Sequence, residues 1–144
     1  MESNKFPANK INQKQQNILL PLAGESIPAG FPSPADNYIE DKIDINEHLI
    51  HNPESTFFLR VRGISMIGAG IHDGDLVIVD RSLNANPGHI VVAIVDGEFT
   101  LKRLTYLKGE AYLEAENDIY PKIDLRQYQN VQIWGIAIYC IHKL

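Results

Sequence analysis

The chain has 144 residues, a length typical of one domain with a single hydrophobic core. Of these residues, 44% are hydrophobic and 22% are charged, which excludes a wholly disordered chain. The formal net charge of -5 argues against direct binding of duplex DNA, because such proteins usually present a basic face to the phosphates.

The compartment is indicated by two further features. The first residues contain no apolar run typical of a signal peptide, and no segment approaches the roughly 20 apolar residues that a membrane span requires. The only cysteine, Cys140, has no partner for an internal disulfide, which favours a reducing compartment. We therefore expect a cytoplasmic protein, neither secreted nor embedded in a membrane.

The N-terminal third has little regular pattern. Residues 1–18 are rich in Asn, Gln and Lys and are predicted to form a mobile arm. Residues 19–34 contain four prolines, which favour an extended backbone. Asp44 followed by Glu47 resembles a helix N-cap with its reciprocal partner, so a short helix is expected at 44–50. An Asn-Pro pair ends it.

The rest of the chain carries β-strand signals. Phe57, Leu59 and Val61 alternate with more polar positions, which predicts a strand with this apolar face turned inward. Asp96-Gly97 is the dipeptide that best suits a tight hairpin turn. Strands are predicted around 57–61 and over residues 75–80, 89–95, 98–104 and 131–142, the last covered on both faces. The domain is expected to be mainly β.

A metal site is not predicted. The five histidines do not cluster in the sequence, since only His48 and His51 are close and no second pair accompanies them. Asp73 and Asp75 flank a predicted turn and are expected to make it soluble. Neither a phosphate-binding loop nor a GxSxG motif is present, which disfavours nucleotide hydrolysis and α/β-hydrolase chemistry. The histidines are His48, His51, His72, His89 and His142.

Ser65 and Lys102 are the residues with the clearest chemical potential. Ser65 follows a predicted strand and precedes a glycine-broken segment, where it is either an exposed nucleophile or an ordinary turn residue. Alternation along the strand places Lys102 and Arg103 on opposite faces, so one of them must point toward protein. A buried Lys102 would have a lowered pKa and could accept a proton from a serine, whereas a lysine at the sheet edge would keep its ammonium in water.

Four segments together resemble the LexA/UmuD family of self-cleaving serine peptidases, and most closely its UmuD branch. The resemblance covers residues 29–144 well and the first 28 residues poorly. It implies a fold of packed, strongly curved β-sheets with one or two short helices. The segments, in the family's order, are AGFPSPADNYIED (29–41), IDINEHLIHNP (43–53), FFLRVRGISMIGAGIHDGDLVIVD (57–80) and VDGEFTLKRL (95–104).

The resemblance also implies roles for individual residues. Ser65 would be the nucleophile, Lys102 its general base, and the backbone N–H groups of Ser65 and Met66 the oxyanion donors. The bond cut would be Ala29-Gly30. Residues 1–29 would then be a cleavable arm, and residues 30–144 a peptidase and dimerisation domain that needs no cofactor.

The family's biology gives the expected partners. Cleavage would be stimulated by the RecA filament on single-stranded DNA during the SOS response. The trimmed product would be a homodimer and the active accessory subunit of a UmuC-type DNA polymerase in translesion synthesis.

Three positions depart from the UmuD pattern. Ile64 stands where many members have Asp, but the position is apolar in the LexA branch. Ala29 stands where well-known members have Cys, and Ala is similarly small. Arg103 replaces a frequent second lysine, which leaves Lys102 as the candidate base in this strand.

Two other functions are compatible with the same sequence. The first is a regulatory binding module on the same fold, without self-cleavage, that acts on a polymerase or a LexA-type partner. The second is a peptidase that acts in trans like the signal peptidases, which share a serine/lysine pair.

Overall fold

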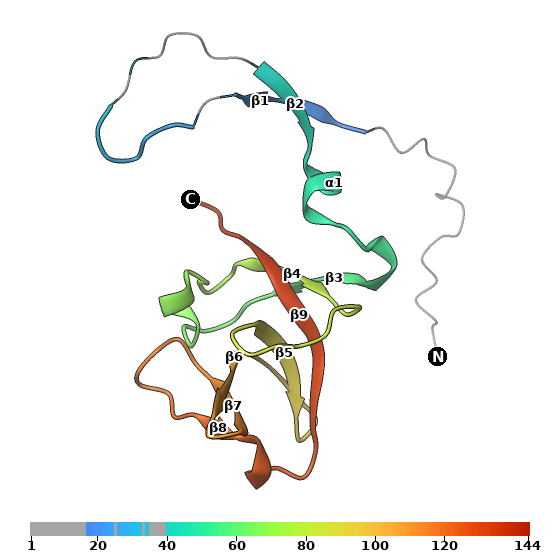
Figure 1. Ribbon diagram of the computed structural model, residues 1–144, viewed down its shortest axis with the longest axis vertical. Coiled ribbons are helices and arrows are strands. Elements are labelled where there is room, and N and C mark those ends of the chain that lie inside the picture. Colours follow the sequence, from blue (N-terminus) through green and yellow to red (C-terminus); the bar gives the residue numbers. More distant parts are fainter. Residues whose placement is uncertain (1–16, 25, 33, 35–39) are drawn as a thin grey trace. The chain divides into compact units, whose positions relative to one another are not determined.

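The computed structural model of the chain describes residues 17–24, 26–32, 34 and 40–144, and these fall into two compact units (Figure 1). The first unit runs to Leu49 and the second spans Ile50–Leu144. The predicted mobile arm, residues 1–18, lies outside the described residues except for its last two positions. No helix in the described part of the chain is long and apolar enough to cross a membrane.

The first unit contains a two-stranded antiparallel sheet followed by one helical turn. Strand β1 (Leu19–Ala23) pairs with β2 (Glu40–Asp44), and helix α1 (Ile45–Leu49) follows directly. The Asp44 carboxylate accepts hydrogen bonds from the backbone N–H groups of Asn46, at 3.0 Å, and Glu47, at 3.4 Å. These bonds satisfy N–H groups that lack a partner at a helix start. The predicted short helix and its cap are thus confirmed.

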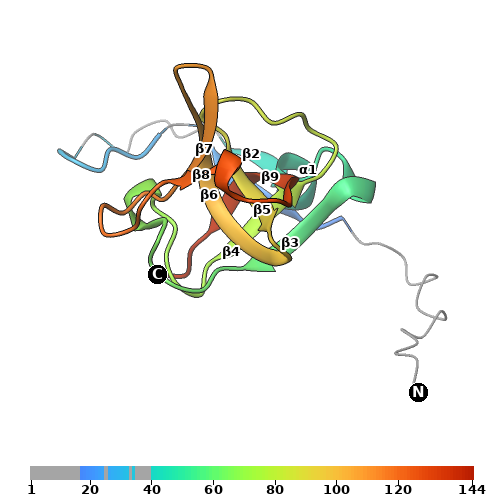
Figure 2. The same ribbon diagram turned by 90° about the horizontal axis from the view of Figure 1, so that it is seen from below.

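The second unit is built on a seven-stranded antiparallel sheet with the strand order β3-β4-β9-β5-β6-β7-β8. Strand β6 bends strongly along its length (Figure 2). This architecture confirms the predicted mainly β class. The strands are β3 (Thr56–Arg60), β4 (Leu76–Asp80), β5 (Ile90–Val95), β6 (Glu98–Leu107), β7 (Glu110–Glu114), β8 (Ile123–Asp124) and β9 (Val131–Ile141), and short 3-10 turns lie at Pro53–Ser55, Ile67–Ala69 and Leu125–Gln127.

The hairpin between β5 and β6 forms as predicted. Its two turn residues have positive φ angles, 47° at Asp96 and 83° at Gly97. Both residue types tolerate this conformation, which matches the twist of the flanking strands. Lys108 and Gly109 repeat the pattern, with φ angles of 52° and 79°, and lead β6 into β7. The strand β7 was not predicted.

Two clusters of buried side chains form the core of the second unit. They are Met66, Ile71, Val77, Val79 and Val92 in one cluster, and Val91, Ala93, Leu104, Leu113 and Ile136 in the other. Leu59 and Val61 pack against the first cluster, as the predicted inward face of β3 requires. Phe57 belongs to the same predicted face but is 41% exposed, because β3 is the terminal strand in the order and Phe57 packs on Trp134 at its margin.

Asp80, at the end of β4, joins the segment before β3 to the segment after β4. Its buried carboxylate accepts hydrogen bonds from the side chains of Asn52, Ser55 and Ser82, and from the Ser82 backbone N–H. Burial opposes ionisation, but these donors outweigh it and lower the pKa of Asp80 to about 2. The carboxylate is therefore charged at neutral pH, and it fixes the start of β3.

Strand β9 lies between β4 and β5, and its middle is buried at Gly135 and Ile136. A Cβ atom at Gly135 would lie 2.5 Å from Val79 Cγ1 and 3.2 Å from Arg81 Cγ. Both separations are shorter than ordinary van der Waals contacts. The absence of a side chain at Gly135 thus lets β4 and β9 pair closely.

Gly135→Ala is expected to lower the free energy of unfolding by about 1–3 kcal/mol, because the added methyl overpacks the core. Val79→Ala removes the clashing atom, so the double variant should be more stable than the sum of the two single effects implies. Denaturant unfolding followed by circular dichroism measures these differences. Gly30→Ala is the control, since a Cβ atom there has nothing within 4 Å. Equal losses of stability in Gly135→Ala and Gly30→Ala would contradict this prediction.

Candidate functional site

Ser65 lies in the turn that connects β3 to the 3-10 segment Ile67–Ala69, as predicted. The turn is fixed at its start by Gly63, whose N–H donates a hydrogen bond to Asp73 Oδ1 at 2.6 Å. Gly63 adopts a φ of 89°. The turn is fixed again beyond Ser65, because Met66 is only 2% exposed and belongs to the core. Ser65 is thus half-buried between two fixed points.

The segment after β7 supports this turn from another side. Gly68 N–H donates to Glu116 O at 2.8 Å, and Asn117 Nδ2 donates to Ile64 O at 3.1 Å. A Cβ atom at Gly68 would lie 2.6 Å from Glu116 O, so only glycine permits this approach. The residues on both sides of Ser65 are therefore anchored to the segment that follows β7.

Lys102 projects from β6 toward Ser65. Its Nζ lies 3.2 Å from Ser65 Oγ and 3.2 Å from Leu101 O, and the residue is 9% exposed. Desolvation by burial lowers the pKa of Lys102, since the charged ammonium loses water without gaining a carboxylate among these contacts. Of the two orientations that the sequence left open, the structure has the buried one.

Arg103 points to the opposite face of β6, as the alternation predicts. It pairs with the Glu116 carboxylate and donates to Gly88 O at 2.6 Å. An arginine keeps its proton under all ordinary conditions and cannot act as a base. Lys102 is thus the residue of this pair that can exchange a proton with Ser65.

A groove of about 410 Å³ opens beside Ser65. One of its margins is β3, which pairs with β4 alone among the described residues, so its other edge can accept a further strand. Apolar side chains dominate the lining, and Arg60 and Arg62 add positive charge. The lining residues are Leu59, Arg60, Val61, Arg62, Ser65, Met66, Val77, Val92, Phe99, Thr100 and Leu101.

The predicted cleavage bond, Ala29-Gly30, belongs to the first unit, whereas Ser65 and Lys102 belong to the second. Both residues of the bond are exposed. Their neighbours Ile27 and Phe31 are 91% and 90% exposed, which is unusual for large apolar side chains. The role of this bond stays a prediction.

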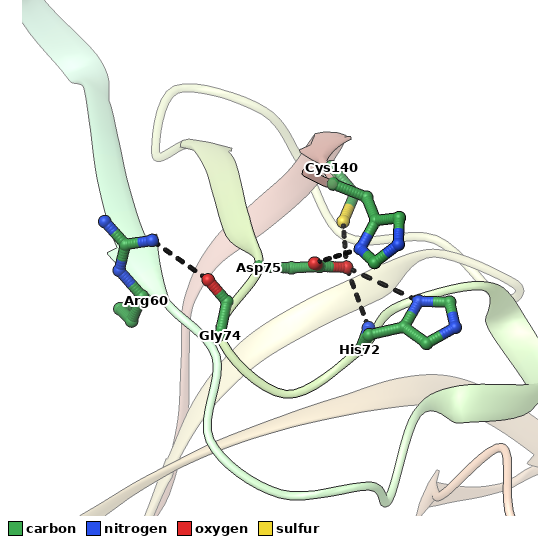
Figure 3. Close-up of polar contacts among 6 residues, drawn as sticks. Arg60, His72, Gly74, Asp75 and Cys140 are labelled. Carbon is green, nitrogen blue, oxygen red and sulfur yellow. Dashed lines mark hydrogen bonds and ion pairs between the residues drawn. The ribbon is translucent and has the colours of Figure 1, made fainter. Parts of the chain in front are cut away.

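The burial of Asp75 contradicts the prediction that this residue makes the turn soluble. Asp75 is 4% exposed and accepts hydrogen bonds from the His72 backbone N–H at 2.8 Å and from Cys140 Sγ at 3.3 Å, as Figure 3 shows. His142 Nδ1 lies 2.6 Å from the other carboxylate oxygen. The backbone bond from His72 is the main cause that lowers the pKa of Asp75 to about 2, and it outweighs desolvation.

The expectation that the histidines do not cluster was also wrong. The rings of His72 and His142 stack with their centroids 4.4 Å apart, although the residues are far apart in the sequence. Antiparallel pairing explains this, because β4 and β9 align Leu76 with Ile141 and so bring the preceding Asp75 beside His142. Sequence spacing along one segment cannot reveal a contact made by strand pairing.

Comparison with known proteins places this chain in a family. The sequence profile described as "Peptidase S24-like" matches residues 21–138. The chain is 45% identical to Protein SamA of Salmonella typhimurium over 123 residues, which cover 85% of each chain. It is 41% identical to Protein MucA of Escherichia coli over 123 residues, covering 85% of this chain and 84% of MucA.

A repressor is also similar. The LexA repressor of Pasteurella multocida is 38% identical over 129 residues, which cover 88% of this chain and 60% of the repressor. The profile match extends over most of the chain, and the identities exceed those needed to infer common ancestry. The chain therefore belongs to the peptidase S24-like family, the LexA/UmuD family of self-cleaving serine peptidases.

Proposed function

We propose that this chain is a serine endopeptidase that cuts its own Ala29-Gly30 bond, with Ser65 as nucleophile and Lys102 as general base. The observation that carries the proposal is the 3.2 Å separation between Lys102 Nζ and Ser65 Oγ, made by a lysine that is 9% exposed. Proton transfer between two groups requires this hydrogen-bond distance, and burial favours the neutral amine that can accept the proton.

The reaction follows from these two groups. Neutral Lys102 takes the proton of Ser65 as Oγ attacks the carbonyl carbon of Ala29. The resulting ammonium returns the proton to the nitrogen of Gly30 as the peptide bond breaks, which leaves an ester between Ser65 and Ala29. Lys102 then activates a water molecule that hydrolyses this ester and frees Ser65. No metal or cofactor takes part in this sequence.

As Ser65 attacks, negative charge develops on the carbonyl oxygen of Ala29, and hydrogen-bond donors are needed to stabilise it. The backbone N–H groups of Ser65 and Met66 are proposed for this role, and within the described residues neither donates to a backbone carbonyl. Met66 is fixed in the core, so these groups would be held in place before the reaction. Donors of this kind typically contribute about 10²–10³-fold to the rate.

The groove suits the segment around the cleavage bond. Ile27 and Phe31 offer apolar side chains to the apolar lining, and the small Ala29 and Gly30 permit close approach of the carbonyl to Ser65. The open edge of β3 can pair with this segment as an added strand. Docking within one chain, or onto the partner within a dimer, gives a high effective concentration of substrate.

The family suggests what controls cleavage and what the product does. We propose that the RecA filament on single-stranded DNA, formed after DNA damage, stimulates docking of the arm. The product, residues 30–144, would form a homodimer and act as accessory subunit of a UmuC-type polymerase in translesion synthesis. The similarity to SamA and MucA over 85% of the chain supports this assignment, whereas the similarity to the LexA repressor covers 60% of that protein.

The parent chain is expected to split between Ala29 and Gly30 during incubation at alkaline pH, because the dyad then holds a neutral amine. Ser65→Ala and Lys102→Arg should both stay intact, since the first lacks the nucleophile and the second cannot accept a proton. Intact-mass spectrometry over hours measures the products. Arg103→Lys is the matched control for Lys102→Arg and should still cleave. An intact parent chain, even with activated RecA filament, would favour the regulatory binding module instead.

The rate of self-cleavage is expected to rise with pH until Lys102 is fully deprotonated. Burial lowers the pKa of Lys102 from its ordinary value, so the rise should end below the pH at which an exposed lysine titrates. Since the pKa of Lys102 is lower in the folded than in the unfolded chain, protonation of Lys102 destabilises the folded state. This loss of stability grows as the pH falls below the pKa of the unfolded chain. Single-turnover rates between neutral and alkaline pH test this dependence. A flat profile would argue against a lysine base.

A further inference from the structure

A second group of chemically active side chains lies outside the proposed peptidase site, in the second unit. It consists of His72, Asp75, Cys140 and His142, here called the His-Asp-Cys cluster (Figure 3). Asp75 immediately precedes β4, while Cys140 lies near the end of β9 and His142 directly follows that strand. None of these side chains contributes to the proposed peptidase reaction.

Three members of the His-Asp-Cys cluster, His72, Asp75 and His142, lie close enough together to share one metal ion. One ligand atom from each of His72, Asp75 and His142 lies within 4.8 Å of the others. His142 Nδ1 is 2.6 Å from Asp75 Oδ1, and His72 Nδ1 is 3.7 Å from Asp75 Oδ2. Ligands at about 2.0–2.1 Å from a tetrahedral zinc ion lie about 3.3 Å from one another, a value between these two separations.

An unsatisfied group points into the same space. His72 Nδ1 is the one buried side-chain nitrogen or oxygen, among the residues that the structure describes, without a hydrogen-bond partner. A buried polar atom without a partner is costly, and such atoms call for an explanation such as an ion. A metal ion bound to Nδ1 would satisfy it.

The carboxylate supplies negative charge at the centre of the cluster. Asp75 is buried, and its carboxylate accepts hydrogen bonds from the His72 backbone N–H and from Cys140 Sγ. The two imidazoles are neutral ligands when they lose their protons, which is the form that metals bind. A set of two histidines, one aspartate and one cysteine suits zinc better than magnesium or calcium, which prefer oxygen ligands.

Cys140 can complete a four-coordinate site. Its Sγ is 3.3 Å from Asp75 Oδ2, to which the thiol donates its proton in a hydrogen bond. A zinc ion would displace this proton, because a coordinating cysteine binds as thiolate.

We propose that His72, Asp75, Cys140 and His142 bind one divalent transition-metal ion of the zinc type. The side chains of His72 and His142 are 43% and 41% exposed, so both rings can turn out of their stacked arrangement toward a shared ion. The ion would join the C-terminal end of β9 to the turn before β4. Asp73, in the same turn, accepts a hydrogen bond from the backbone N–H of Gly63, which lies two residues before Ser65.

The test uses the full chain without an affinity tag and with Ser65→Ala, so that self-cleavage does not alter the sample. After removal of metals with a chelator, Zn²⁺ is titrated in competition with a chromophoric chelator. One equivalent should bind. His72→Gln and His142→Gln should each weaken binding by roughly tenfold or more, since each removes a direct ligand and loss of supporting groups alone costs about 10–100-fold.

His48→Gln is the matched control, because His48 lies close to a second histidine, His51, in the sequence and does not belong to the His-Asp-Cys cluster. It should leave Zn²⁺ affinity unchanged. Circular dichroism without metal checks that each variant folds. The proposal is overturned if the folded parent binds no equivalent of Zn²⁺, or if His48→Gln weakens binding while His142→Gln does not.

Co²⁺ reports on the fourth ligand. The parent should show the visible absorption of tetrahedral Co²⁺ together with a thiolate charge-transfer band in the near ultraviolet, and Cys140→Ser should lose that band. A parent spectrum without the band would overturn the assignment of Cys140 as a ligand. Failure of self-cleavage would not affect this result, because the binding measurement is made on a chain that lacks the nucleophile.

Discussion

The pairing of β9 with both β4 and β5 is the constraint on which the second unit depends. Strands β3 and β4 lie on one side of β9 and the remaining four strands on the other. Ser65 follows β3 and Lys102 lies on β6, so the contact between them spans this division. The close approach at Gly135 lets β9 lie directly against β4 within this sheet.

Burial of Lys102 shows how stability and chemistry oppose each other at this site. An ammonium group taken out of water without an anionic partner destabilises the folded state, and loss of the proton relieves this cost. The same loss would give the neutral amine that the proposed reaction requires. The surrounding core, with Val91 opposite Lys102 in the ladder, keeps water from the lysine and also contributes to packing.

Much of the fold could be predicted because its signals are local. Asp96-Gly97 fixes its own turn geometry, Asp44 caps the helix next to it, and alternation along β6 separates Lys102 from Arg103. The strand β7 was missed because its apolar run is only three residues long and lies between two glutamates. The burial of Asp75 was missed because it depends on strand pairing across 67 residues of chain.

Glu116 connects two parts of the second unit that are far apart in the sequence. Its carboxylate binds Arg103, the outward neighbour of Lys102, while its backbone oxygen holds Gly68 in the segment that follows Ser65. One residue thus links the strand that carries Lys102, the proposed base, to the turn that carries Ser65, the proposed nucleophile. Glu116 thereby couples the outer face of β6, where Arg103 lies, to the turn that holds Ser65.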